Sequence, residues 1–248
     1  MRPLGVSAGA LPVAVLRKDL EPDQSLFDPA DPQLRAAANL LQEGLNATDV
    51  VQEEAIWTKI INTYGGVDAP WVPDVVGRAW GNRGNARSRQ GRLEESLNDY
   101  NTAIKICPWS GDPVLNRGVV LEALGRFDEA VVDYRAVLEA QPNDPAAWNN
   151  LGNAVAGLGK WEEATKHYGR AAALAPEFSF AQANLALANY QLGNKNEAVK
   201  SMRALVRRYP EFPDMRAALA AALWADGLES QAAPRAVGAL EAPPDPRK

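Results

Sequence analysis

Cysteine and histidine are nearly absent from this sequence, which has one residue of each, Cys107 and His167, among 248. One cysteine cannot form an intramolecular disulfide, and it has no second thiolate with which to build a metal or redox site. One histidine excludes any site that needs two. The sequence therefore predicts no metal and no cofactor.

Long apolar runs are also missing. The most apolar stretch near a helix runs from Met215 to Trp224, is interrupted by Arg216, and is far shorter than the ~20 residues that span a bilayer. Pro3 and Pro12 break the apolar run of the first fifteen residues, unlike the uninterrupted core of a secretory signal.

An excess of basic residues is lacking as well. The net charge is −5 and the pI is about 5.1. Nucleic-acid-binding domains are normally basic, so we expect no nucleic-acid partner.

Titratable residues are not grouped at a spacing that suits catalysis. His167 has no partner motif. The stretch 152–160 resembles a phosphate-binding loop, but Ala154 replaces a required glycine and Trp161 replaces Ser/Thr. We therefore expect no enzyme activity and no small-molecule substrate.

A repeat of 34 residues dominates the rest of the chain. Proline, glycine, small, tyrosine and asparagine residues recur in phase at this step: Pro108, Pro142, Pro176 and Pro210; Gly84, Gly118 and Gly152; Gly91, Gly125, Gly159 and Gly193; Ser96, Ala130, Ala164 and Ala198; Tyr100, Tyr134 and Tyr168; Asn82, Asn116, Asn150 and Asn184. So many columns in phase indicate one structural unit repeated along the chain.

The unit at 145–178 shows the pattern most fully, with the residues Trp148, Leu151, Gly152, Ala164, Tyr168 and Pro176. This pattern resembles the tetratricopeptide repeat (TPR), a pair of antiparallel helices. The resemblance implies an all-α fold, a right-handed α-solenoid of stacked helix-turn-helix units.

Each column has a physical reason. Gly84 and its equivalents are expected where a neighbouring helix approaches closely, opposite the small residues of the second helix. Gly91 and its equivalents are expected in left-handed C-caps, and the prolines end the second helix. Asp112 and Asp144, each followed by proline, are predicted to cap the next helix.

The flanks are assigned by periodicity and proline content. Residues 33–45 and 49–64 read as two amphipathic helices, followed by a loop at 65–74 that contains Trp71. The predicted organisation is an extended or disordered segment at 1–32, a degenerate hairpin and loop at 33–76, four TPR units at 77–110, 111–144, 145–178 and 179–212, a capping helix at 213–233 and a disordered Pro-rich tail at 234–248. Docking of a tail in the protein's own groove is an alternative.

In the TPR family, ligands contact mainly the first helices, which line one groove. Carried onto this chain, the family positions give a predicted partner-binding groove of Arg78, Asn82, Asn85, Arg89, Asn116, Val119, Asn149, Asn150, Asn153, Phe180, Asn184 and Leu187. Side-chain amides suit the backbone of an extended peptide, and arginines suit a carboxylate. The alternative is that the asparagines bond within the array.

A narrower resemblance involves Pro70-Trp71-Val72-Pro73-Asp74, residues 78–87 and Cys107-Pro108-Trp109. These segments resemble chloroplast TPR proteins of plants and algae, some of them assigned to the thylakoid lumen. The resemblance implies a chloroplast location, peripheral association with a membrane complex and a role in photosystem assembly or maintenance. This chain departs from that group in having no recognisable targeting peptide.

The leading hypothesis is a non-catalytic scaffold that binds a protein or extended peptide. Two alternatives remain open: a fragment of a larger enzyme whose catalytic domain is absent, and a structural protein that associates with itself.

Overall fold

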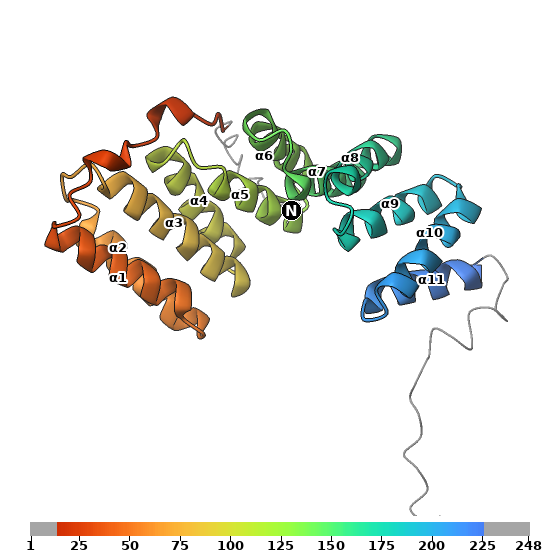
Figure 1. The fold of residues 1–248 in the computed structure, drawn as a ribbon. Helices are drawn as coiled ribbons and strands as arrows, with labels where there is room; N and C mark the ends of the chain where they lie inside the picture. Colours follow the sequence, from red (N-terminus) through yellow and green to blue (C-terminus); the bar gives the residue numbers. More distant parts are fainter. Residues whose placement is uncertain (1–13, 226–248) are drawn as a thin grey trace, which may run out of the picture. The chain divides into compact units, whose positions relative to one another are not determined.

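Helix pairs follow one another along the chain in the computed structural model, which describes residues 14–225 (Figure 1). No strand occurs in that range, so the prediction of an all-α helical repeat solenoid is confirmed. The chain divides into two compact units, unit 1 up to Leu158 and unit 2 from Gly159.

Unit 1 begins with two short 3-10 turns and continues with seven helices whose bounds are η1 Lys18–Leu20, η2 Gln24–Leu26, α1 Pro32–Asn46, α2 Val50–Tyr64, α3 Val72–Arg89, α4 Leu93–Ile106, α5 Asp112–Ala123, α6 Phe127–Ala140 and α7 Pro145–Gly157. Each helix packs against the next along the chain, and α1, α3, α5 and α7 also contact one another in that order. These four helices therefore line one face of unit 1.

The glycines between paired helices behave as predicted. Gly91 and Gly125 in unit 1 have φ of 77° and 73°, and Gly159 and Gly193 have φ of 75° and 84°. Only glycine adopts this left-handed region without a steric cost, which explains the column.

Of three helix starts discussed in the sequence analysis, one agrees with the structure and two differ from it. Asp144 caps α7 by accepting from the N–H groups of Ala146 and Ala147, as expected. Asp112, in contrast, is the first residue of α5, and Gly111 occupies the N-cap position. Helix α3 begins at Val72, because Pro73 fits a first turn, so the loop ends at Trp71 rather than at residue 74.

The aromatic core of unit 1 lies at its first three helices. Trp57, Ile60 and Trp71 are almost fully buried among α1, α2 and α3. The Trp71 indole N–H donates to the Asp31 carboxylate at 2.8 Å, so this tryptophan packs internally and is not an exposed contact residue.

The glycine column within the first helices is required by a tyrosine ring. A Cβ at Gly118 would lie 2.6 Å from Tyr134, and one at Gly84 would lie 2.8 Å from Tyr100. The small residue at position 96 plays a second part, because the Ser96 hydroxyl donates to the Gly84 carbonyl at 2.8 Å. The close approach was predicted, but the group that approaches is the tyrosine.

Unit 2 contains four helices, which are α8 Trp161–Leu174, α9 Ser179–Gln191, α10 Lys195–Arg208 and α11 Pro213–Ala225. Its core beside α9–α11 is built from alanines with Met202, Leu205 and Met215 as the largest buried side chains. The predicted capping helix corresponds to α11. Residues 226–233 of that prediction and the predicted tail at 234–248 lie outside the described residues.

The N-terminal segment has a defined path from Ala14 onward, where the sequence shows no helical period. The Arg17 N–H donates to the Pro108 carbonyl at 2.8 Å, and Ala14 is buried. Further along, Phe27 packs against the α1–α3 core. The predicted extended or disordered segment is thus fastened to unit 1 at both ends of residues 14–31; residues 1–13 lie outside the described residues.

Candidate functional site

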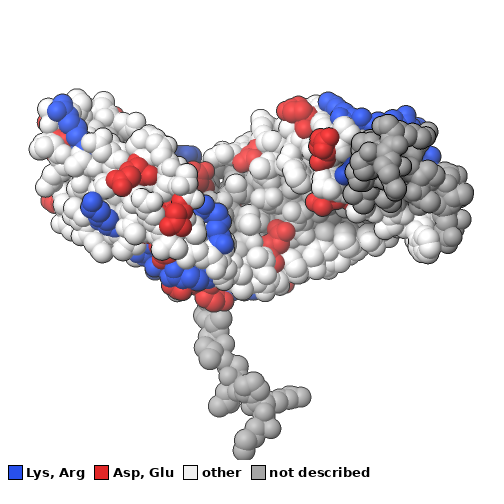
Figure 2. Space-filling view, turned by 90° about the horizontal axis from the view of Figure 1, so that it is seen from below, with Lys and Arg blue, Asp and Glu red and all other residues white. Residues whose placement is uncertain are grey.

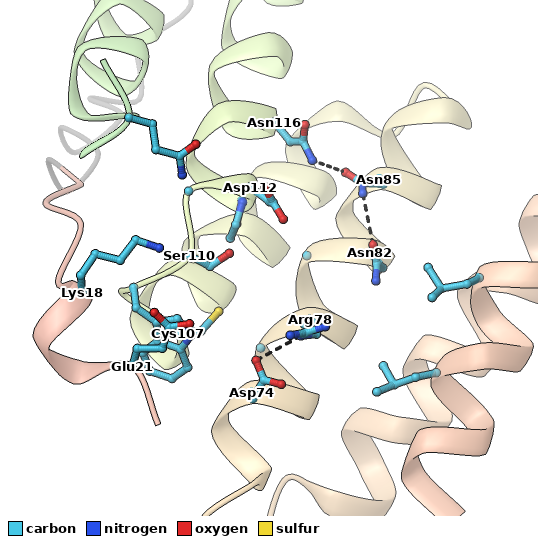
Figure 3. A pocket seen from close by; sticks show the side chains of 18 residues that line it. Lys18, Glu21, Asp74, Arg78, Asn82, Asn85, Cys107, Ser110, Asp112 and Asn116 are labelled. Carbon is cyan, nitrogen blue, oxygen red and sulfur yellow. Dashed lines mark hydrogen bonds and ion pairs between the residues drawn. The ribbon is translucent and has the colours of Figure 1, made fainter. Parts of the chain in front are cut away.

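A groove of about 450 Å³ opens on the face of unit 1 formed by α1, α3 and α5 (Figure 3). Side chains from α3 and α5 form its centre, Leu41 and Leu45 of α1 form one wall, and the α4–α5 loop forms another. Lys18 and Glu21 of the N-terminal segment complete the lining. The groove is therefore built from parts of unit 1 that are far apart in the sequence.

Three predicted asparagines form a hydrogen-bonded chain along this groove. The Asn116 amide donates to the Asn85 side-chain oxygen at 3.0 Å, and the Asn85 amide donates to Asn82 at 3.4 Å (Figure 3). The Tyr100 hydroxyl also donates to the Asn85 oxygen, at 2.7 Å. The asparagines therefore bond to one another, as the alternative hypothesis expected, and they also line the groove.

The hydrogen bonds along the chain use only part of the bonding capacity of these amides. Asn85 uses its oxygen twice and its nitrogen once, so its role is to hold its neighbours. A side-chain amide has two donor hydrogens and one acceptor oxygen. The bonds along the chain leave the amide hydrogens of Asn82 and the oxygen of Asn116 as donor and acceptor.

Charged groups of both signs surround the amides. Arg78 is exposed and forms an ion pair with Asp74, one turn earlier on α3, at 3.1 Å. Lys18, Glu21 and Asp112 also line the groove. With three carboxylates against two cations, the groove is not built to attract a single anionic group.

Cys107 forms part of the groove floor but is 3% exposed. Burial raises the pKa of its thiol to about 12, and the thiol donates to the Ala103 carbonyl at 3.0 Å. A thiol in this state is a packing residue rather than a nucleophile. A Cβ on Gly77 would lie 2.5 Å from the Cys107 sulfur, so glycine at position 77 makes room for it.

Five other predicted residues of unit 1 lie outside the lining of this groove: Arg89, Val119, Asn149, Asn150 and Asn153. Arg89 pairs with Glu53 of α2, since the end of α3 lies beside the start of that helix. Asn149 is 6% exposed and donates to Asn150, which removes it from a partner's reach. Val119 is exposed on α5, outside the groove lining.

Asn153 belongs to a second polar cluster in unit 1. Burial raises the pKa of Glu122, while hydrogen bonds from Tyr134 and Asn153 partly offset the rise. The Tyr134 hydroxyl lies 3.1 Å from the Glu122 carboxylate. Tyr134, the repeat equivalent of Tyr100, thus also donates to a side chain of the preceding first helix, although Glu122 lies three positions beyond Val119, the equivalent of Asn85.

The three predicted residues of unit 2 lie on α9. Phe180 and Leu187 are exposed, and the Phe180 ring packs edge-on against Phe212 with ring centres 5.1 Å apart. Asn184 lies between them in the sequence and is half-buried. This part of the predicted set is more apolar than the part in unit 1.

The sequence analysis missed two buried ion pairs between paired helices. Arg117 forms a bidentate pair with Asp133, at 2.6 and 2.8 Å, and Arg83 pairs with Asp99 in the same way at 2.8 and 2.9 Å. Each pair spans 16 residues, and the two pairs are 34 residues apart. Both pairs can be found in the sequence, because their arginines and their aspartates each recur at the 34-residue period.

The sequence analysis also missed Lys18 and Glu21 of the groove lining, because the N-terminal segment has no repeat to align.

Within residues 14–225, no cluster of His, Cys, Asp and Glu is placed to hold a metal ion. In the same range, no helix is both long and apolar enough to cross a bilayer.

Comparison with known families agrees with the geometry. Models of the tetratricopeptide repeat match residues 77–110, 145–178 and 181–211, and a model described as TPR repeat matches residues 118–159. Together these matches cover about half of the chain. The chain belongs to the tetratricopeptide-repeat family. Members of this family generally serve as protein-interaction scaffolds, and this general role applies to this TPR protein.

Solved structures show the same fold. A TPR protein from Parabacteroides merdae matches with a TM-score of 0.67 and 18% identity over 80% of this chain and 76% of its own. MamA from Desulfovibrio magneticus matches with a TM-score of 0.62 and 16% identity over 73% of this chain and 97% of its own. Pseudomonas aeruginosa pilF has a TM-score of 0.58 and 23% identity over 64% of this chain and 73% of its own.

At these identities the structures establish the fold alone. No curated protein sequence gives a significant match to the chain.

Proposed function

We propose that this TPR protein acts by binding, not by catalysis, and that the groove of unit 1 holds an extended segment of a partner protein. The observation that carries the proposal is the amide chain from Asn82 through Asn85 to Asn116 along the groove. An extended peptide offers alternating carbonyls and N–H groups, which match the free amide hydrogens of Asn82 and the free oxygen of Asn116.

The geometry separates residues that bind from residues that support. Asn82 ends the amide chain, so replacing it leaves the bonds among Asn85, Tyr100 and Asn116 in place. Asn85 is different, because its loss deprives both Tyr100 and Asn116 of their acceptor.

A peptide selected from a random library against the full-length chain provides the probe. We expect Asn82→Ala to weaken its binding about five- to tenfold, with no change in helicity or melting temperature. Asn82, Asn116 and Asn150 changed together to Ala are expected to weaken it further while the helices persist. Asn98→Ala, an exposed asparagine on α4, is the matched control. Unchanged binding by all these variants would place the peptide outside the groove.

We further propose that the partner belongs to a photosynthetic complex and that the chain acts in the chloroplast, in its thylakoid lumen or at the membrane surface. This rests on the resemblance of residues 70–74, 78–87 and 107–109 to chloroplast TPR proteins. Fractionation of the source cells, followed by cross-linking and purification of the tagged full-length chain, tests it. Photosystem subunits among the cross-linked proteins support the proposal, and recovery outside the chloroplast refutes it.

A further inference from the structure

A cleft of about 360 Å³ lies between α9 and α10 in unit 2. Leu185, Ala186, Ala204 and Leu205 supply its apolar lining. Its polar lining consists of Gln182, Asn189, Glu197, Ser201 and Arg208, so one acidic and one basic side chain belong to it. This cleft does not include Phe180, Asn184 or Leu187, so it is separate from the predicted groove.

The repeat explains why the cleft exists. In unit 1 the same junction is filled by three large polar side chains, because Arg117 pairs with Asp133 and also donates to Asn101 at 2.7 Å. Two repeats later, the residues at these columns are Gly169, Leu185 and Ser201. A Cβ on Gly169 would meet nothing within 4 Å. Loss of the polar trio therefore leaves an open cleft with an apolar floor.

Beyond the lining residues, the parts of α8 and α10 that follow Glu197 and its equivalent Glu163 carry basic side chains and no acidic ones. No Asp or Glu occurs in residues 164–176 or 198–210, whereas Lys166 and Arg170 on α8 and Lys200, Arg207 and Arg208 on α10 are all exposed. The Tyr209 hydroxyl donates to the Glu177 carbonyl at 3.4 Å, so the C-terminal ends of α8 and α10 lie together. Basic side chains also gather along one edge of unit 2 in Figure 2.

The helix dipole accounts for only part of this basic surface. Cations are favoured in the last turn of a helix, which covers Arg207 and Arg208. Lys166 and Lys200 lie further from the helix ends. Nine Lys and Arg stand against six Asp and Glu in residues 159–225, a net charge of +3, whereas residues 14–158 have thirteen against twenty-one, a net charge of −8.

The chain itself carries a segment with the complementary chemistry. Residues 19–31 contain five acidic residues and no basic one. Leu26, in 3-10 turn η2, is 68% exposed between Asp23 and Asp28. Both aspartates are exposed, and each carboxylate accepts from a nearby backbone N–H, of Ser25 and Ala30 respectively.

We propose that the cleft of unit 2 binds the N-terminal acidic segment of a second copy of this chain, with Leu26 on the apolar floor and Asp23 and Asp28 against Lys200, Arg207 and their neighbours. The contact joins two different surfaces, so it is head-to-tail and adds copies in a ring or row. The cleft belongs to unit 2 and the peptide groove to unit 1, but the segment that docks also supplies Glu21 to the lining of the groove.

Sedimentation of the full-length chain over a range of concentrations tests the proposal. We expect reversible association that weakens at least tenfold between 0.1 and 1 M salt, because the screening length falls from about 10 Å to about 3 Å. Lys200→Glu with Arg207→Glu should weaken association at least tenfold. The matched control is Asn98→Glu with Lys105→Glu, which places the same charges at the same repeat positions on α4.

Two variants on the segment side complete the set. Asp23→Asn with Asp28→Asn removes the charges but keeps the backbone hydrogen bonds, and Leu26→Ser removes the apolar anchor; each should weaken association severalfold. Ala204→Trp, which fills the cleft, should do the same. All positions are exposed, and an unchanged circular dichroism spectrum shows that folding is intact.

Mixing gives the sharpest result. Lys200→Glu/Arg207→Glu retains a normal segment, and Asp23→Lys/Asp28→Lys retains a normal cleft. Each variant should be monomeric alone, and a mixture of the two should form a dimer. A monomeric wild type, an association that these variants leave unchanged, or a mixture that stays monomeric would each overturn the proposal.

Discussion

At the scale of single residues, burial decides what the few chemically special side chains can do. The sequence has one cysteine, Cys107, directly before Pro108 of the proline column. Nothing in the sequence indicates whether its thiol is reactive. The structure answers through the raised pKa and the hydrogen bond from the thiol to the Ala103 carbonyl.

We therefore expect Cys107 to resist alkylation although it lines a groove. At pH 8 the native protein should react with iodoacetamide at least a hundredfold more slowly than the protein in 6 M urea, because a pKa of about 12 leaves almost no thiolate. Mass spectrometry of timed samples measures both rates. Equal rates in the two states would show that the thiol is open to solvent.

Glu54 on α2 gives a second prediction at this scale. Burial raises its pKa, but hydrogen bonds from Arg87, Gln90 and Arg92 outweigh that effect and lower the pKa to about 2. A carboxyl group whose pKa is depressed on folding stabilises the protein above its unfolded pKa, near 4.5, and loses this contribution as the pH falls toward 2.

Glu54→Gln should thus lower the free energy of unfolding by about 2 kcal/mol at pH 7. The difference from wild type should shrink steadily between pH 4.5 and pH 3 in urea titrations. Glu94→Gln, at an exposed position on α4, is the control and should have little effect. A difference that does not vary with pH would mean that the charge of Glu54 is not the stabilising feature.

At the scale of helices, the period in the sequence predicted the paired units and the glycine turns between them, because each column serves the same local need in every repeat. The start of α3 was missed for a physical reason. Pro70 and Pro73 mark a loop by composition, yet Pro73 also fits the first turn of a helix, and only the burial of Trp71 distinguishes the two. The N-terminal wall of the groove has no period and could not be found in this way.

Glycines inside helices can be required by close packing or can be merely tolerated, and mutation to alanine distinguishes the two cases. Gly81 and Gly118 both lie inside first helices, but a Cβ on Gly81 would have Ala103 as its nearest neighbour at 4.0 Å, whereas one on Gly118 would lie 2.6 Å from Tyr134. Gly81→Ala should stabilise the protein by about 0.5–1 kcal/mol, since alanine is the better helix former. Gly118→Ala should destabilise it by about 1–3 kcal/mol through overpacking.

Chemical denaturation of the two variants checks these signs. Gly118→Ala combined with Tyr134→Leu, which removes the ring edge, should recover part of the loss. A Gly118→Ala variant as stable as wild type would show that the ring moves away without cost.

At the scale of the whole molecule, the repeats share a backbone plan but differ in what fills them. Unit 1 buries Trp57, Trp71 and two bidentate Arg–Asp pairs, and blue and red side chains lie close together over it in Figure 2. In unit 2 the columns of those pairs hold His167 and Ser201 where unit 1 has aspartates. Alanines make up most of the core beside α9–α11. The sequence predicts the shared arrangement of helices, because that arrangement is periodic. The buried side chains differ from repeat to repeat and depend on neighbours in three dimensions, so they could not be predicted in this way.

This contrast predicts an uneven stability along the chain. In a repeat array, local opening is governed by each unit and its immediate neighbours, and apolar burial supplies most of the favourable free energy. Alanine buries much less surface than tryptophan, isoleucine or tyrosine, so α9, α10 and α11 should open more readily than α2, α3 and α4. Hydrogen exchange of the full-length protein, read by mass spectrometry, should show protection falling from the first set of helices to the second by at least tenfold.

Ala186→Leu, which enlarges a buried side chain in α9, serves as a probe of the packing. If it raises protection in α9–α11, the core there is underfilled, and if it lowers protection, the alanines are already closely packed. Uniform exchange across both sets of helices would contradict the expectation and would mean that the array unfolds as a single cooperative body.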